Sequence, residues 1–255
     1  MPLELVTVPC LADNYAYLLH DSDTGATALI DAPEAAPVLQ VLQDRDWSLS
    51  EVWITHHHDD HVQGLSAVLS AFSARVTGAK ADMARLPELD QQVSDKDSFE
   101  FAGHTVQVFD VSGHTVGHVA YYVADASAVF TADSLMALGC GRLFEGTAAQ
   151  MWASLSKLAA LPADTIVCSG HEYTAANAKF ALTIDPDNAE LTCRADEVAA
   201  ARVNGVPTVP STLKNELATN PFLRASDDAI RARLGMVNAS DTEVFAEIRA
   251  RKDAF

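Results

Sequence analysis

Residues 52–61 read VWITHHHDDH, an apolar run that ends in six consecutive histidines and aspartates. The first four residues have the β-branched and aromatic side chains that are typical of a buried strand. The next six include four of the nine histidines in a chain of 255 residues. Polar groups at this density beside a buried strand are costly unless a partner binds or neutralises them. The pattern therefore predicts a layered fold in which a buried strand delivers a binding site at its end.

Strand-like and helix-like segments alternate through the first two thirds of the chain. An apolar stripe at helical spacing, Leu65, Val68, Leu69 and Phe72, follows the histidine cluster. Thr147 and Gln150 form a capping-box pattern that opens another helix. This alternation predicts an α/β domain. The predicted strands are residues 26–31, 52–55, 105–111, 118–123, 128–132 and 165–168.

The pattern changes after about residue 174, where we expect the strands to stop. Residues 188–204 read as a helix closed by Gly205, and residues 227–234 as a helix closed by Gly235. Ser240 and Glu243 form a capping box that opens a last helix. We therefore predict a mixed domain up to about residue 174 and a small helical domain after it.

Composition excludes several classes of function. The net charge of −18 and a pI near 4.6 argue against binding to nucleic acid or to an anionic membrane surface. The four cysteines contain no CxxC pair, so we expect reduced and mostly buried thiols. The N-terminus lacks the pattern of a secretory signal, and no apolar stretch approaches the roughly 20 residues of a membrane helix. We expect a cytoplasmic enzyme.

Four predicted strands each end within about three residues of a side chain that can bind metal. In α/β folds the carboxyl ends of strands are where binding sites assemble, so these loops are expected to converge. Imidazole and carboxylate ligands without cysteine suit zinc and its neighbours. There are more candidates than one tetrahedral ion needs, and two ions that share a carboxylate would use them all. The candidates are His56, His58, Asp60, His61, His114, Asp133 and His171.

The remaining histidines are given structural roles. His104 precedes its predicted strand and so belongs to the opposite end of the sheet. His20, His57 and His118 are likewise not expected to bind metal. Asp31 ends a strand at the same edge as the cluster, so we expect its carboxylate to hold a ligand imidazole in place.

The sequence Thr-His-x-His-x-Asp-His, with a later Gly-His, an isolated Asp after a strand and a final Gly-His, resembles the metallo-β-lactamase superfamily. Three further stretches, FTADSLMALGCGRLFEGT, CSGHEYTAANAKFA and RARKDAF, resemble the glyoxalase II (hydroxyacylglutathione hydrolase) family. This resemblance extends over nearly the whole chain, from LADNYAYLL onwards. It implies an αββα sandwich with a C-terminal helical domain. Residues 1–174 would form the dinuclear metal hydrolase domain, and residues 175–255 the substrate-binding domain.

The resemblance also implies a role for each matching residue. The first metal would bind His56, His58 and His114, and the second would bind Asp60, His61 and His171. Asp133 would bridge the two ions, and Asp60 would also orient the hydroxide bound to them. Substrate-binding residues would be Arg142, Leu143, Phe144, Tyr173, Arg249 and Lys252.

Three positions depart from the family pattern. Asp59 stands where a fourth histidine is common, and Phe144 lacks the hydroxyl of a family tyrosine. Ala32-Pro33-Glu34 replaces the usual Pro-Gly turn, which leaves the backbone after Asp31 undetermined.

The function implied is hydrolysis of S-(2-hydroxyacyl)glutathione thioesters. S-D-lactoylglutathione would give D-lactate and glutathione, the second step of methylglyoxal detoxification. Two divalent ions per chain are expected, with zinc favoured over iron or manganese, in a monomer that binds neither nucleic acid nor membrane. The alternatives are a glutathione persulfide dioxygenase with a single iron and a metal-binding module without catalysis. A nuclease is disfavoured by the charge, and a β-lactamase by the C-terminal half.

Overall fold

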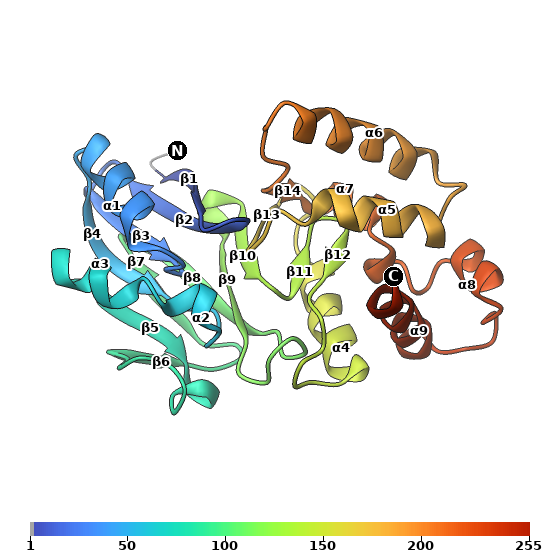
Figure 1. Cartoon of the computed structure of the whole chain (residues 1–255). Helices are drawn as coiled ribbons and strands as arrows, with labels where there is room; N and C mark the ends of the chain where they lie inside the picture. The colour runs from blue at the N-terminus through green and yellow to red at the C-terminus, as the bar shows by residue number, and fades with distance from the viewer. Residues whose placement is uncertain (1–2) are drawn as a thin grey trace. The chain divides into compact units, whose positions relative to one another are not determined.

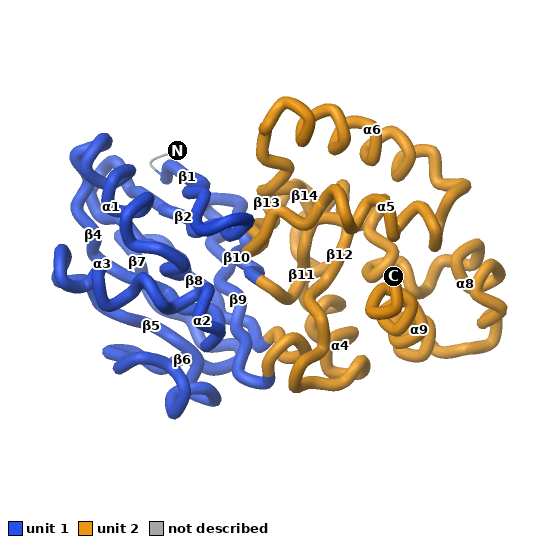
Figure 2. The backbone as a smooth tube through the Cα atoms, viewed as in Figure 1, with its two compact units in different colours: residues 1–110, 116–132 blue, residues 111–115, 133–255 orange. Residues whose placement is uncertain are grey.

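The computed structural model describes residues 3–255, and the chain forms two compact units (Figure 2). Unit 1 comprises residues 1–110 and 116–132, and unit 2 comprises residues 111–115 and 133–255. Each unit is described by itself.

The first sheet of unit 1 contains six strands in the order β1-β2-β3-β4-β5-β6 (Figure 1). Strands β1 to β3 pair antiparallel, and β3 to β6 pair parallel. Helices α1 and α3 cover one face of this sheet. Val38 and Leu65 from these helices pack with Val52 of β4 and with Ile54, which directly follows β4. The elements are β1 (Leu3–Cys10), β2 (Asn14–Asp21), β3 (Ala26–Ile30), α1 (Ala35–Asp44), β4 (Ser48–Trp53), α2 (Asp59–Val62), α3 (Leu65–Ala71), β5 (Arg75–Ala79), η1 (Lys80–Asp82) and β6 (Gln91–Val93).

The second sheet lies against the opposite face of the first. In unit 1 it contains β7 (Ser98–Phe101), β8 (His104–Asp110), β9 (Val119–Val123) and β10 (Ala128–Ala132), all antiparallel, with η2 (Ala124–Ala126) between the last two. Because side chains alternate along a strand, Trp53 points away from the helices that Val52 and Ile54 contact. Its ring packs against Phe99, Phe101, Tyr121 and Phe130 at centroid distances of 5.4–6.3 Å.

The strand that precedes the histidine cluster is therefore anchored on both faces. The Tyr121 hydroxyl adds a hydrogen bond of 2.8 Å to the carbonyl oxygen of Ile54, two residues before His56. Buried aromatic packing and a satisfied backbone carbonyl together make the base of the histidine loop rigid.

Unit 2 is mainly helical. Its elements are β11 (Leu135–Met136), β12 (Gly139–Cys140), α4 (Ala148–Ala159), β13 (Ile166–Ser169), α5 (Thr174–Ile184), α6 (Ala189–Val203), β14 (Ser211–Thr212), α7 (Leu213–Thr219), η3 (Pro221–Leu223), α8 (Asp228–Leu234) and α9 (Asp241–Ala254). Phe222 lies 6.0 Å from Phe180 of α5 and 5.9 Å from Phe245 of α9, and Phe245 lies 5.9 Å from Trp152 of α4. These rings join the helices into one core.

The predicted helix ends are confirmed. Both capping boxes, Thr147 with Gln150 and Ser240 with Glu243, are present. Gly235 ends α8 at φ 71°, a left-handed conformation that glycine adopts without strain. All six predicted strands are also found, although β4 begins at Ser48 rather than Val52.

Two expectations need correction or qualification. Strands do not stop at residue 174, because β14 pairs antiparallel with β13, through residues 211–212. Helix α7, capped by Thr212, also lies between the two helices predicted at residues 188–204 and 227–234. As expected, Cys10, Cys140 and Cys168 are buried, Cys193 is exposed, and none of these four residues forms a disulfide. Across residues 3–255, no helix combines the length and the hydropathy needed to cross a membrane.

Candidate metal centre

The loop between β4 and α2 brings four of the predicted ligands together in unit 1. His56 and His61 are buried, and His58 and Asp60 are partly exposed. His56 Nε2 lies 3.1 Å from His58 Nδ1. Two donors on a tetrahedral ion with bonds of about 2.0–2.1 Å lie about 3.3–3.4 Å apart, so this spacing fits a shared ion.

Asp31 orients this loop. Its carboxylate accepts hydrogen bonds from the Thr55 amide at 2.8 Å and from the Thr55 hydroxyl at 2.8 Å, and it lies 2.7 Å from His61 Nδ1. The predicted contact between Asp31 and an imidazole of the cluster is confirmed. Because Nδ1 of His61 faces Asp31, Nε2 is the nitrogen available for a metal ion.

Thr55 extends the same arrangement to His56. Its hydroxyl oxygen lies 3.0 Å from Nδ1 of His56, so Nε2 of that ring also points toward the ligand cluster. Fixing the second nitrogen of a ligand imidazole sets both its tautomer and its ring orientation.

Unit 2 contributes a second set of donors around Asp133. Oδ2 of Asp133 lies 3.4 Å from Nε2 of His114 and 3.3 Å from Nε2 of His171. All three side chains are buried. Nδ1 of His114 donates a hydrogen bond of 2.8 Å to the carbonyl oxygen of Arg142, and this bond orients the ring. These spacings again match donor atoms around divalent ions.

Gly141 allows this set to assemble. A Cβ atom at Gly141 would overlap the backbone oxygen of Asp133 and come within 2.9 Å of Nδ1 of His114. The glycine of the Cys-Gly-Arg segment is therefore required because the backbone approaches two of the predicted ligands closely.

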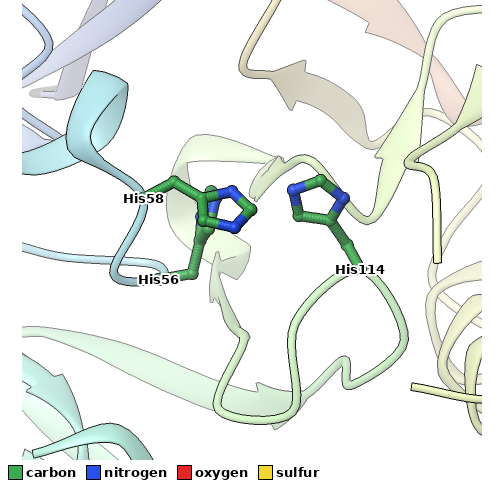
Figure 3. A group of neighbouring side chains, drawn as sticks. All are labelled: His56, His58 and His114. Atoms are coloured by element: carbon green, nitrogen blue, oxygen red, sulfur yellow. The ribbon is translucent and has the colours of Figure 1, made fainter. Parts of the chain in front are cut away.

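Within residues 3–255, three groups of candidate ligands have donor atoms within 4.8 Å of one another: His56, His58 and His114 (Figure 3); Asp60, His61 and His171; and Asp31, His56 and His61. The third group contains Asp31, whose oxygen already faces Nδ1 of His61. We therefore interpret Asp31 as an orienting carboxylate rather than a ligand. Imidazole and carboxylate donors without a thiolate fit a divalent ion of the zinc type. The residues present thus fit a metal centre.

The predicted substrate residues in the segment after Gly141 differ in exposure. Phe144 is 61% exposed, and its ring lies edge-on to His114 at 5.3 Å. Arg142 is exposed, and Leu143 is half-buried. Tyr173 stacks on the ring of His171 at 4.6 Å, with 39% of its surface exposed. Phe144 and Tyr173 therefore contact histidines that are predicted to bind metal, and Arg142 is accessible to solvent.

Arg249 does not have the partly exposed position expected for it. It is only 5% exposed and donates to the Cys140 carbonyl oxygen at 3.0 Å and to Asp253 at 2.8 Å. Lys252 is half-buried, donates to the Ala176 carbonyl oxygen at 3.3 Å, and burial lowers its pKa. The face of α9 on which both residues lie is packed inward, so Arg249 is held by the protein itself.

The histidines given structural roles have other partners. Nδ1 of His57 lies 2.8 Å from Asp82, and His104 lies between Asp21 and Asp125. His20 stacks on Trp47 at 3.9 Å. His118 is fully buried and stacks on the ring of His56 at 4.5 Å, which helps to fix the orientation of that ring.

Comparison with known proteins agrees with this geometry. Residues 13–171 match the metallo-beta-lactamase superfamily, and residues 172–255 match the family described as "Hydroxyacylglutathione hydrolase C-terminus". Over the full length of both chains, the sequence is 71% identical to a hydroxyacylglutathione hydrolase of Roseobacter denitrificans and 65% identical to one of Ruegeria pomeroyi.

Solved structures confirm the fold. The B3 metallo-beta-lactamase BLEG-1 superposes with a TM-score of 0.67 at 22% identity, covering 86% of this chain and 99% of that one. ETHE1 from Myxococcus xanthus superposes with a TM-score of 0.63 at 24% identity, covering 100% of this chain and 99% of that one. The predicted fold class, a metallo-β-lactamase sandwich with a C-terminal helical region, is confirmed, and its cluster of histidines and aspartates binds divalent metal. The chain belongs to the hydroxyacylglutathione hydrolase family of the metallo-β-lactamase superfamily.

Proposed function

We propose that this chain hydrolyses S-(2-hydroxyacyl)glutathione thioesters, converting S-D-lactoylglutathione to D-lactate and glutathione. The observation that carries the proposal is full-length identity of 71% and 65% to two proteins named hydroxyacylglutathione hydrolase. The proposed setting is the cytoplasm, where the second step of methylglyoxal detoxification would take place, and the proposed state is a monomer.

Two divalent ions are proposed, with zinc favoured over iron or manganese. His56, His58 and His114 would hold the first, Asp60, His61 and His171 the second, and Asp133 would bridge them. When bound, the ions would lower the pKa of a water molecule and polarise the thioester carbonyl. Support comes from the donor spacings of 3.1–3.4 Å and from the oriented imidazoles of His56, His61 and His114.

The protein's own residues would neutralise the charge of the ions and orient the attacking group. The carboxylates of Asp60 and Asp133 would balance the charge of the ions, and Asp60 would also orient the attacking hydroxide. No general acid is needed for the leaving group, because a thiol with a pKa of about 8.5 leaves readily as a thiolate.

Substrate binding is assigned to unit 2. Residues 175–255 would form the substrate-binding domain that follows the hydrolase domain of residues 1–174. Arg142, Leu143 and Phe144 would contact the glutathione moiety from one segment, and Tyr173, Arg249 and Lys252 from others. For Arg249, burial makes support of the Cys140 backbone the larger part of its role.

Metal analysis combined with a thiol-release assay tests the proposal. We expect two divalent ions per chain and release of free glutathione from S-D-lactoylglutathione. One iron per chain with oxygen consumption would instead identify a persulfide dioxygenase. Bound metal without turnover of any glutathione thioester would identify a non-catalytic module.

A further inference from the structure

Asn14 lies against the predicted ligand Asp60, although 46 residues separate them in the sequence. Its side-chain amide Nδ2 donates to Oδ2 of Asp60 at 3.1 Å and to the backbone oxygen of the same residue at 3.1 Å. Asn14 is 5% exposed and begins β2, where it pairs with Cys10 across the β1–β2 hairpin. The amide is therefore held in place by a sheet rather than by a flexible loop.

The chemistry of the contact defines the orientation of the amide. Both atoms of Asp60 near it are hydrogen-bond acceptors, so only the donor side of the asparagine can face them. One amino group that binds both the backbone oxygen and the carboxylate of a residue restricts the torsions between these two acceptors. This restriction matters because the Asp60 side chain is 43% exposed, and solvent alone would leave it several rotamers.

A merely structural role in holding α2 does not account for the contact. Ala32 already fixes the backbone of this four-residue helix, since its amide donates to the His61 carbonyl and its carbonyl accepts from the Gly64 amide, both at 2.8 Å. Asn14 adds a bond to the Asp60 backbone oxygen and, unlike Ala32, a bond to the Asp60 carboxylate, which holding the helix backbone does not require.

We propose that Asn14 is a positioning residue that holds the Asp60 carboxylate in its metal-binding orientation. The inference rests on the proposed function, in which Asp60 binds the second ion. An uncharged amide suits this task, because it fixes an anionic ligand without competing with the cation for it. Loss of an outer partner of a metal ligand typically costs about 10–100-fold in metal affinity, and we expect that range here for one of the two ions.

The test is zinc titration of the metal-free full chain against a competing chromophoric chelator. Asn14→Leu keeps the size of the side chain and removes the donor, and Asn14→Ala serves as a second variant. The matched control is Thr27→Val, which removes a buried hydrogen bond of 2.9 Å to His20 in the same sheet. Thermal unfolding of each metal-free variant confirms that it is folded.

The expected result is weaker binding of one ion in both Asn14 variants, with the other ion and the Thr27→Val protein unchanged. In an Asp60→Ala background, adding Asn14→Leu should change nothing further, because the two residues act as one unit. Parent-like binding of both ions, an equal effect of Thr27→Val, or additive losses in the double variant would overturn the inference. A parent protein that binds metal but releases no thiol would refute the proposed function alone, since the titration reads the coupling of Asn14 and Asp60 independently.

Discussion

Replacing Arg249 should lower the stability of the protein as well as its catalytic activity. The guanidinium is 5% exposed and binds the Cys140 carbonyl at 3.0 Å. It also lies 5.1 Å above the ring of Phe222 and pairs with Asp253 at 2.8 Å. Cys140 belongs to the segment that leads from Asp133 to Gly141, so loss of this hydrogen bond should disturb the proposed metal ligands of unit 2.

The magnitude follows from these contacts. A hydrogen bond from a charged group to a buried carbonyl contributes about 1.5–3 kcal/mol, and its loss leaves the oxygen unsatisfied. The cation–π contact adds about 0.5–1 kcal/mol. The pair with Asp253 adds less than about 1 kcal/mol, because that carboxylate is 38% exposed and partly screened. We expect Arg249→Ala to reduce the free energy of unfolding by about 2–4 kcal/mol, since these contributions are not fully additive.

Urea unfolding measures this loss, and Arg251→Ala is the matched control. Arg251 is on the same helix turn, is 47% exposed and pairs with Glu247, so its removal should cost less than about 1 kcal/mol. Arg249→Ala should also retain less metal and show a lower kcat, whereas Lys252→Ala should mainly raise KM. If the urea midpoints of Arg249→Ala and Arg251→Ala coincide, the buried anchor contributes nothing and this reasoning is wrong.

Three further changes test other parts of the structure. Asp133→Ala should lower occupancy of both ions together, and elemental analysis that still finds two tightly bound ions would contradict the bridging role. Gly141→Ala should also reduce metal content, because its Cβ would displace the Asp133 carbonyl; a metal content equal to the parent's would count against that steric reason. Hydrogen bonds from the His104 ring raise its pKa, the one to Asp125 having the larger effect and the one to Asp21 the smaller. The contribution of His104 to stability is therefore present below the unfolded-state pKa of about 6.5 and is lost as pH rises through the folded-state pKa. Urea unfolding should show this decrease in the free energy of unfolding in the parent but not in His104→Gln.

The sequence predicted the site where local patterns determine position. The proposed ligands His56 and Asp133 each follow a strand end, and a strand pattern and its polar end are both local features. Capping boxes and the αL glycine at residue 235 are also local, so helix ends were accurate. The predicted strands do not include β1, β2, β5, β6 and β7. They also do not include β11, β12 and β14, since two residues carry no periodicity.

The inward or outward direction of a helix face could not be predicted in the same way. The i, i+3 spacing of Arg249 and Lys252 correctly places them on one side of α9, yet spacing does not say what that side contacts. Only the fold shows that it packs on Cys140 and Phe222. The Asn14–Asp60 contact is missed for a similar reason, because it joins residues whose separation in sequence gives no pattern.

The turn after Asp31 shows how the chain compensates for a departure from its family's pattern. Asp31 has φ 56°, a left-handed conformation that costs a non-glycine residue roughly 1–2 kcal/mol. In that conformation its amide donates to the Trp53 carbonyl at 3.0 Å while its carboxylate binds Thr55 and His61. Hydrogen bonds to a charged acceptor contribute about 1.5–3 kcal/mol each, so they offset the strain. Ala32 then binds the His61 carbonyl and the Gly64 amide at the carboxyl end of α2. The positive φ therefore lies at Asp31 itself, and the Ala-Pro-Glu segment after it needs no glycine to hold the ligand loop in place.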